Sequence, residues 1–317
     1  MGSGIWSTDV YDAASRYRAS TGRSAFAHTD SGARTVHSAL DPRAAVRESR
    51  DSDEHPQSLP IAVLFDVTGS MGHVPRRLQE KLPQLLGLLL RGGYAKDPQI
   101  MFGAIGDATC DRAPLQVGQF ESDNRMDDDL GRILLEGGGG GQMTESYELA
   151  LYFMARHVRT DAWDKRGRRG YLFIIGDELA YSRVKANEVR AVIGGRSTED
   201  IPTRAILDEV RSRWDTYYLL PSDAGYGRDK RVLTFWRDLL GQQALELDDL
   251  DAACETIALT VGLGEEAVDL DTGLADLRDA GSDAGATVSK ALAHVGAGRV
   301  ARSALPALGG GTPVERL

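Results

Sequence analysis

Cysteine is scarce in this 317-residue sequence, which contains only Cys110 and Cys254. Two cysteines exclude a disulfide scaffold and a four-cysteine zinc site. No stretch approaches the roughly 18 apolar residues of a membrane-spanning helix. Residues 1–12 have neither a basic flank nor an apolar stretch, so we predict no signal peptide. These absences predict a cytoplasmic protein that does not contact a membrane.

Positive charge is also in short supply, with 37 Lys and Arg against 47 Asp and Glu, a formal net charge of −10. Nucleic-acid binding needs a basic surface, so this function is disfavoured. The six histidines show no HxH or HxxxH spacing of the kind that binds zinc. The glycine run 137–141 is not followed by Gly-Lys-Ser/Thr, which argues against a phosphate-binding loop.

Three segments differ in composition. Residues 1–57 are rich in Ser, Ala, Arg and Thr and contain few large apolar residues. They predict an N-terminal extension that is either disordered or packed as an arm on the main domain. Residues 265–317 are rich in Gly and Ala, which predicts one or two short helices and a flexible tail. Residues 58–264 have the apolar pattern of a single folded domain.

Strands and helices are predicted to alternate through residues 58–264. Buried strands are expected at 61–65, 99–105, 171–175 and 216–220, with weaker strands at 115–120 and 244–247. Helical spacing covers 75–89, 146–159, 206–214, 231–240 and 250–263, and Pro83 should kink or split the first of these helices. This order predicts an α/β fold, Rossmann-like and doubly wound around a mostly parallel sheet. Ligands of such sheets bind at the carboxyl ends of strands.

Three oxygen-bearing side chains follow the first predicted strand at a spacing of two, namely Asp66, Thr68 and Ser70. Gly69 and Gly72 allow the backbone between and after them to turn sharply. In such a tight loop, one carboxylate and two hydroxyls can converge on one point. These hard oxygen donors suit Mg²⁺, Mn²⁺ or Ca²⁺ and do not suit zinc.

Two further aspartates stand directly after predicted strands. Asp107 follows the strand at 99–105, and Asp177 follows the strand at 171–175. With Asp66, they place acidic side chains at the carboxyl ends of three candidate neighbouring strands. The alternative interpretation is that each residue only caps the next helix. This is the better interpretation for a single such residue, but a poor one for Asp66, Thr68 and Ser70 together with Asp177.

Residues 66–72, DVTGSMG, resemble the DxSxS motif of von Willebrand factor A (vWA) domains, in which it builds the metal-ion-dependent adhesion site. The resemblance covers roughly residues 58–264. It implies that Asp66, Thr68 and Ser70 bind Mg²⁺, or Mn²⁺ or Ca²⁺ in its place. Asp177 corresponds to the family's aspartate after the fourth strand and completes the cluster.

The family also supplies a threonine from a loop that precedes a helix, and here that loop is 137–144. Thr144 is one candidate for this ligand. One branch of the family, which includes domains attached to alpha-type kinases, has a glutamate after this loop. When Glu145 is aligned with that glutamate, Met143 stands at the threonine position. The same branch resembles this chain at 106–111, around Asp107. His73 lies beside the motif and is a candidate contact for a bound partner.

What the resemblance implies is binding rather than turnover. A partner's Asp or Glu would fill the open coordination position on the cation, which implies that the protein acts as an adaptor or scaffold. Intracellular bacterial members of the family suggest an AAA-type ATPase as the class of partner. Two alternatives remain open. One is a metal-dependent hydrolase or nuclease that uses Asp66, Asp107 and Asp177. The other is a structural subunit of a larger assembly whose metal site has decayed.

Two other features have simpler interpretations. The basic run at 165–169 predicts a solvated loop, or alternatively a docking patch for an acidic partner. Cys110 is expected to be an inert cysteine rather than a reactive thiol.

Overall fold

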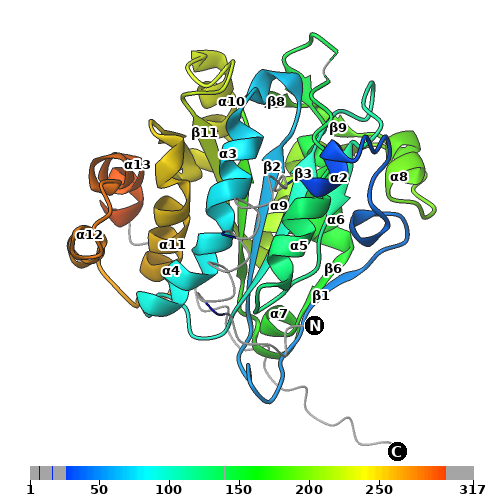
Figure 1. The fold of residues 1–317 in the computed structure, drawn as a ribbon. Helices are drawn as coiled ribbons and strands as arrows, with labels where there is room; N and C mark the ends of the chain where they lie inside the picture. Colours follow the sequence, from blue (N-terminus) through cyan, green and yellow to red (C-terminus); the bar gives the residue numbers. More distant parts are fainter. Residues whose placement is uncertain (1–6, 8–15, 17–25, 139, 298–317) are drawn as a thin grey trace, which may run out of the picture.

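A six-stranded sheet forms the centre of the computed structural model, which describes residues 7, 16, 26–138 and 140–297 (Figure 1). All of its neighbouring strands run parallel except the last pair, which is antiparallel. In spatial order the strands are β12 (Ala244–Leu247), β11 (Trp214–Pro221), β7 (Gly170–Ile175), β2 (Leu59–Asp66), β3 (Pro98–Ile105) and β4 (Leu115–Val117). The predicted mostly parallel α/β sheet is therefore confirmed.

Both faces of the sheet are covered, because its central strands β2, β3 and β7 are buried at every position and mostly apolar. Ile61, Val63 and Phe65 of β2 belong to one apolar cluster, and Ala62 and Leu64 belong to the other. Successive side chains of a strand point to opposite faces, so a continuous apolar run needs a layer of helices on each side.

The helices supply these two layers. One face is covered by α3 (Val74–Lys81), α4 (Leu85–Arg91), α5 (Arg125–Arg132) and α11 (Ala253–Gly264). The opposite face is covered by α6 (Tyr147–Arg156), α9 (Thr203–Arg213) and α10 (Lys230–Leu240). Pro83 lies in a 3-10 turn, Leu82–Gln84, that separates α3 from α4, as its position predicts.

Three two-stranded ribbons and several short helices lie outside the central sheet. β1 (Arg47–Ser49) pairs with β6 (Val158–Thr160), β5 (Thr144–Glu145) with β8 (Leu179–Ala180), and β9 (Arg183–Val184) with β10 (Ile201–Pro202). The short helices are α2 (Ala27–Asp30), α7 (Asp161–Arg166) and α8 (Ala186–Val192). Strands of two or three residues are too short to show a sequence period, so none of these ribbons is predicted.

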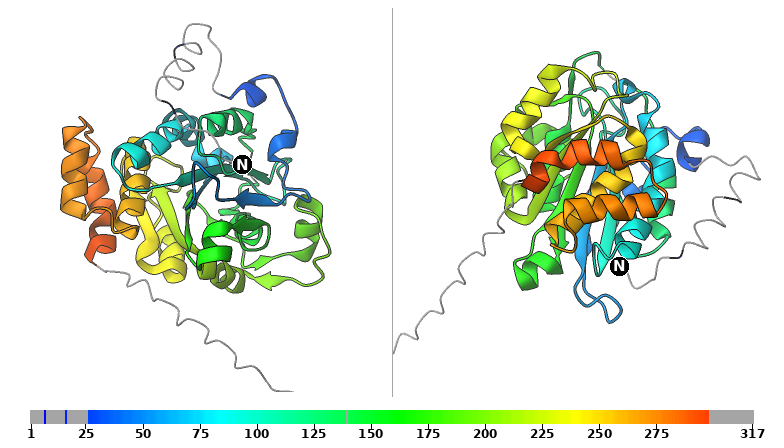
Figure 2. Two further views of the ribbon diagram at one scale, coloured as in Figure 1. Left: turned by 90° about the horizontal axis from the view of Figure 1, so that it is seen from below. Right: turned by 90° about the vertical axis from the view of Figure 1, so that its left-hand side faces the viewer.

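The described parts of both extensions pack against the main domain. β1 lies in the N-terminal extension and pairs with β6, so this part is a packed arm. After residue 264, α12 (Leu270–Asp279) and α13 (Gly285–Ala297) lie beside α11 (Figure 2). Leu277, Val288 and Leu292 of these helices join the first apolar cluster. Residues 298–317, the last part of the segment predicted to end in a flexible tail, lie outside the described residues.

The basic run spans the end of α7 and the turn after it, and residues 165–167 are exposed, in agreement with the predicted solvated segment. Lys165 and Arg166 form ion pairs with Asp51 of the N-terminal arm, at 3.2 and 2.8 Å. Arg168 pairs with Glu265, just after α11, and Arg169 pairs with Asp215 in β11 at 2.9 Å. These carboxylates come from segments far from the basic run in the sequence. They pair with the side-chain cations that a docking patch would present to a partner.

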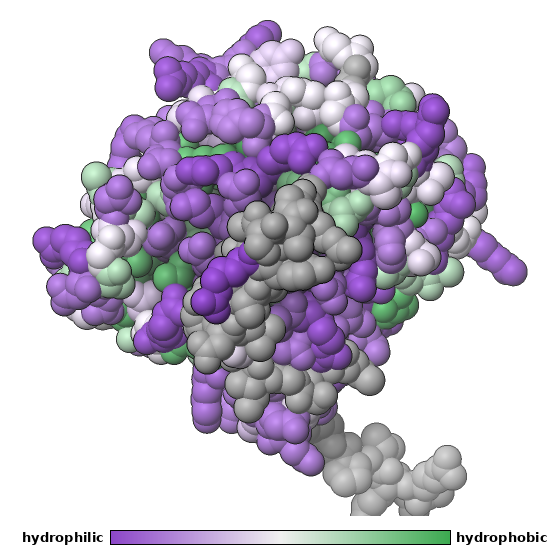
Figure 3. Space-filling model, viewed as in Figure 1, coloured by the Kyte–Doolittle hydropathy of each residue, from purple (hydrophilic) through white to green (hydrophobic). Residues whose placement is uncertain are grey.

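The face seen in Figure 3 is mainly hydrophilic, with hydrophobic residues in scattered areas. Across the described residues, no helix combines the length and apolarity needed to span a bilayer.

Candidate metal centre

The loop after β2 holds the first predicted ligand in a buried position. Asp66 is the last residue of β2 and is fully buried. Its Oδ1 accepts hydrogen bonds from the Thr68 amide at 2.8 Å and from the Thr68 hydroxyl at 2.6 Å. Its Oδ2 accepts a 2.6 Å bond from the hydroxyl of Tyr147 at the start of α6. The spacing of two residues therefore folds Thr68 back onto Asp66.

Ser70 joins this loop to the end of β7. Its hydroxyl donates a 2.8 Å hydrogen bond to Oδ1 of Asp177 and lies 3.3 Å from the hydroxyl of Thr68. The other oxygen of Asp177 accepts a 2.8 Å bond from the backbone amide of Tyr226, in the loop after β11. The structure thus brings together four of the predicted ligands, Asp66, Thr68, Ser70 and Asp177, at the carboxyl ends of β2 and β7.

A glycine-rich loop closes one side of this group. The amide of Gly69 donates to the carbonyl of Gly138 at 2.5 Å, and the amide of Gly137 donates to the carbonyl of Val67 at 3.3 Å. A Cβ on Gly69 would lie 2.9 Å from the Gly138 oxygen, closer than real contacts allow. The glycine at position 69 is therefore required by close backbone approach, whereas the left-handed turn falls at Gly72, with a φ of +53°.

Between these loops lies an open cleft of about 680 Å³. Its lining includes Ser70, Gln142 and Tyr226, glycines of the neighbouring loops, and two acidic residues that the sequence analysis did not single out, Glu145 and Glu178. Both glutamates are buried, with exposed fractions of 1% and 3%. Their proximity to Asp66 and Asp177 makes the centre more acidic than the motif alone predicts.

The sequence holds only a weak signal for these two glutamates. Glu178 follows Asp177 directly, but alternation along a strand would place neighbouring side chains on opposite sides. The sequence predicts a loop around Glu145. The position of Glu145 beside the cleft depends instead on the pairing of β5 with β8. Only this long-range pairing brings Glu145 next to the end of β7.

Burial without nearby positive charge favours the protonated form of each acid. Burial raises the pKa of Asp66 to about 7, although hydrogen bonds from Thr68 and Tyr147 favour its ionised form. Burial, with the charges of Asp66 and Glu178, raises the pKa of Glu145 to about 10. Burial also raises the pKa of Glu178 to about 7 and raises the pKa of Asp177. A bound divalent cation would offset this cost, because it favours the ionised carboxylates.

Asp107 is next to the centre but its carboxylate is already occupied. Oδ1 accepts from the amide of Thr109 at 2.8 Å, and Oδ2 accepts from the hydroxyls of Thr109 and Tyr181 at 2.8 and 3.0 Å. The side-chain amide of Gln142 donates to the same Oδ2 at 2.5 Å. Asp107 therefore organises the loops around the cleft rather than presenting a free carboxylate to it.

The remaining predicted site residues lie at the periphery. Thr144 is in β5, opposite Leu179 of β8, and is partly exposed. Met143 packs against the second apolar cluster. His73 is exposed at the start of α3, and its side chain is not part of the cleft lining. Which of Thr144 and Met143 corresponds to the family's loop ligand stays an open prediction.

The donor set fits a hard divalent cation. Carboxylate and hydroxyl oxygens come from Asp66, Thr68, Ser70 and Asp177, and Glu145 and Glu178 have buried carboxylate oxygens with no hydrogen-bond partner. Such oxygens suit Mg²⁺ or Ca²⁺. Among the described residues, no three His, Cys, Asp or Glu side chains form a metal-binding group by themselves. The set therefore depends on its hydroxyls, and on water, to complete a coordination shell.

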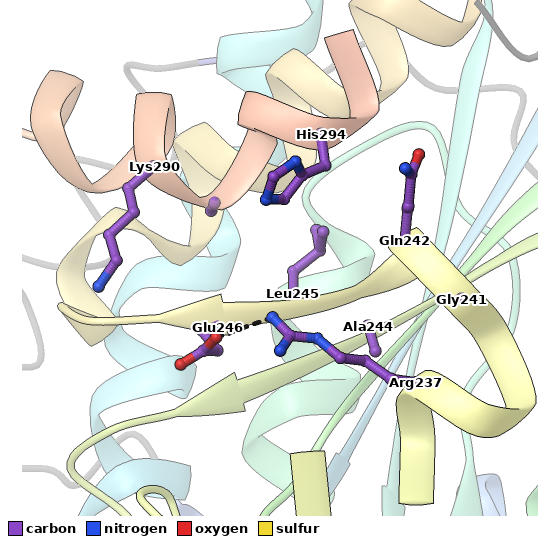
Figure 4. A pocket seen from close by; sticks show the side chains of 9 residues that line it. Arg237, Gly241, Gln242, Ala244, Leu245, Glu246, Lys290 and His294 are labelled. Carbon is purple, nitrogen blue, oxygen red and sulfur yellow. Dashed lines mark hydrogen bonds and ion pairs between the residues drawn. The ribbon is translucent and has the colours of Figure 1, made fainter. Parts of the chain in front are cut away.

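Other features of the described residues are poorer candidates for function. Burial and the charges of Asp111 and Asp107 raise the pKa of Cys110 to about 12, which makes its thiol a poor nucleophile. A second hollow lies between β12 and α13 (Figure 4). Two of the cations around it are neutralised, since Arg237 pairs with Glu246 and Lys290 pairs with Asp248.

No family model matches the sequence, and no curated protein matches it. Solved structures that align with the chain include the pilus adhesin SpaC from Lactobacillus rhamnosus GG in its open conformation (10% identity, TM-score 0.45, covering 70% of this chain and 31% of the adhesin). Proximal thread matrix protein 1 from the mussel byssus also aligns (10% identity, TM-score 0.43, covering 65% of this chain and 48% of that protein). The chain thus spans less than half the length of either protein. These values are too low to indicate a shared function.

Proposed function

We propose that this protein is a vWA-like binding module that holds a divalent cation at the end of β2 and uses it to dock a protein partner. The observation that carries the proposal is the convergence of Asp66, Thr68, Ser70 and Asp177 through hydrogen bonds of 2.6, 3.3 and 2.8 Å. The sheet order supports a doubly wound fold, because β2 lies between β3 and β7. The chain goes first to one side of β2 and later to the other, and ligand sites lie at such switch points.

Each residue has a defined task in this proposal. Asp66 is held in place by Tyr147 and in turn orients the hydroxyl of Thr68. Ser70 is oriented by Asp177, which is fixed by the amide of Tyr226. When bound, Mg²⁺ or a similar cation supplies an open coordination position that an oxygen of the partner can fill. A partner that presents an Asp or Glu matches this position, which gives an adaptor or scaffold role without turnover.

The hydrogen bonds of the Asp107 carboxylate favour a binding function over the hydrolase or nuclease alternative. That alternative needs Asp66, Asp107 and Asp177 to share a reaction centre. The carboxylate of Asp107 accepts hydrogen bonds from Thr109, Tyr181 and Gln142, so it is engaged in holding loops. The cytoplasmic location stays a proposal that rests on the composition of the sequence, and the AAA-type ATPase partner stays one that rests on the resemblance alone.

Cation-dependent capture of partners tests the proposal. The protein is immobilised and exposed to native lysate in Mg²⁺ or in chelator, next to Asp66→Asn and to a control, Asp128→Asn, at an exposed acid on α5. We expect proteins that bind wild type and the control only in Mg²⁺, and none of them on Asp66→Asn. Capture of the same proteins by wild type and both variants, in Mg²⁺ and in chelator alike, would show that the centre is not the docking site.

A further inference from the structure

Two buried carboxylates face the cleft with an oxygen that has no hydrogen-bond partner. These oxygens are Oε2 of Glu145 and Oε2 of Glu178. Both residues line the cleft beside Ser70 and are at least nine-tenths buried. An unpaired carboxylate oxygen out of contact with solvent is strongly unfavourable unless a ligand satisfies it.

The pairing of β5 with β8 brings the two glutamates to the same cleft. Glu145 pairs with Ala180 of β8, and Glu178 lies in the bend directly before β8. Both residues line the cleft beside Ser70.

With all four acids ionised, as cation binding requires, the centre is too negative for a single divalent cation to neutralise. Asp66, Asp177, Glu145 and Glu178 carry four negative charges when ionised, and the lining of the cleft contains no Lys or Arg. One divalent cation leaves two negative charges, which would repel the carboxylate of an acidic partner. Two divalent cations would bring the group to neutrality.

We propose that Glu145 and Glu178 hold a second divalent cation, next to the one at Asp66, Ser70 and Asp177. Two carboxylates do not fill the coordination shell of Mg²⁺ or Mn²⁺, and water supplies the remaining positions, as is usual for Mg²⁺. This inference rests on the proposed function, since it explains how an acidic partner can approach a centre with four carboxylates. It adds two residues and one cation to that centre.

The number of cations bound per chain tests the inference. Mn²⁺ is used as the probe in equilibrium dialysis of the full chain at pH 7.5, and electron paramagnetic resonance detects coupling between neighbouring Mn²⁺ ions. We expect two coupled Mn²⁺ per chain in wild type and one uncoupled Mn²⁺ in both Glu178→Gln and Glu145→Gln/Glu178→Gln. The control Glu80→Gln, at an exposed acid on α3, should bind two.

The outcomes separate the two proposals. One Mn²⁺ in wild type, lost in Asp66→Asn, overturns the second site and leaves the proposed function standing. No Mn²⁺ in wild type overturns both. Two Mn²⁺ retained by the double variant also overturns the assignment to Glu145 and Glu178. Gln keeps the shape of Glu and removes the unpaired charge, and circular dichroism in chelator checks that each variant is folded.

Discussion

At the scale of single residues, the centre depends on backbone atoms as much as on the acidic side chains. Gly69 lets two loops approach within hydrogen-bond distance, since its amide donates to the carbonyl of Gly138. The carboxylates of Asp66 and Asp177 are then held by donors from α6 and from the loop after β11. A change at Gly69 should therefore disturb the centre without removing any charge.

Gly69→Ala is expected to lower the free energy of unfolding by about 1–3 kcal/mol, because the new methyl group would clash with the backbone of Gly138. It should also weaken Mg²⁺ binding by shifting Ser70. Chemical denaturation and isothermal titration calorimetry measure the two effects. Gly285→Ala is the control, since a Cβ there meets nothing within 4 Å. Equal stability and Mg²⁺ affinity in wild type and Gly69→Ala would contradict the close approach.

The pH dependence of stability follows from the raised pKa values of the buried acids. The pKa of Glu145 rises from 4.5 to about 10, and those of Asp66 and Glu178 rise to about 7. A raised pKa adds stability below the unfolded-state value, and this stability is lost as pH rises through the folded-state value. In chelator, the free energy of unfolding should therefore fall between about pH 5 and pH 8, with a slope of up to about 1.4 kcal/mol per pH unit for each proton.

Urea unfolding at several pH values measures this decline, and Glu145→Gln should show a smaller one. Mg²⁺ should oppose the decline at pH 8 and have little effect at pH 5, because it binds only the ionised carboxylates. The ion pairs of Asp161 and Asp251 act in a separate range, since basic partners lower the pKa values of these two acids. Their stabilisation is lost below about pH 4. A Glu145→Gln variant with the wild-type pH profile would contradict the raised pKa.

At the scale of elements, short segments far apart in sequence depend on one another. The arm at Arg47–Ser49 pairs with β6, and the following residues are held by α7. Asp51 accepts hydrogen bonds from the amide and hydroxyl of Ser58 and from the guanidinium of Arg166. These bonds hold the pKa of Asp51 well below its usual range. The arm is thus fixed by charge as well as by strand pairing.

Asp51→Asn should lower the free energy of unfolding by about 1–2 kcal/mol, because it weakens charge-assisted bonds in a largely buried position. It should also make residues 26–50 more sensitive to limited proteolysis. Arg237→Ala is the comparison, since its pair with Glu246 is half exposed and should contribute less than about 0.5 kcal/mol. Equal losses in the two variants would contradict the role of Asp51 in fixing the arm.

At the scale of the whole molecule, the C-terminal helices are continuous with the main core. Val288 and Leu292 of α13 are fully buried in the cluster that also contains α11 and the first face of the sheet. Figure 2 shows α12 and α13 against the side of the molecule that α11 forms. We expect residues 26–297 to unfold as one unit, because removal of α13 would expose part of this shared core.

Leu292→Ala should cost about 2–5 kcal/mol, as for other large-to-small changes in a core, and should lower the melting temperature of the entire protein. Differential scanning calorimetry should show a single transition in wild type and in the variant. Ala293→Ser, at an exposed position on the same helix, should leave the melting temperature unchanged. Two separate transitions, with only the smaller one moved by Leu292→Ala, would show that α13 is an independent unit.

The order of the central strands and of most helices that cover them could be predicted from the sequence, because each depends on a local pattern; α5 and the short ribbons could not. Apolar runs such as Ile61–Phe65 can only be satisfied by burial on both faces, and Pro83 cannot continue a helix. The motif at Asp66, Thr68 and Ser70 is local too, since its bonds span only a few residues. These features are set by neighbours in the chain.

Long-range pairing decided the rest. Glu145 reaches the centre because β5 pairs with β8, and the run at 165–169 is neutralised because Asp51, Asp215 and Glu265 fold back to it. Asp107, which the sequence alone could place only at a strand end, is engaged by Tyr181 and Gln142 from other loops. Contacts between segments tens of residues apart leave no period or spacing in the sequence, so their partners appear only when the chain is folded.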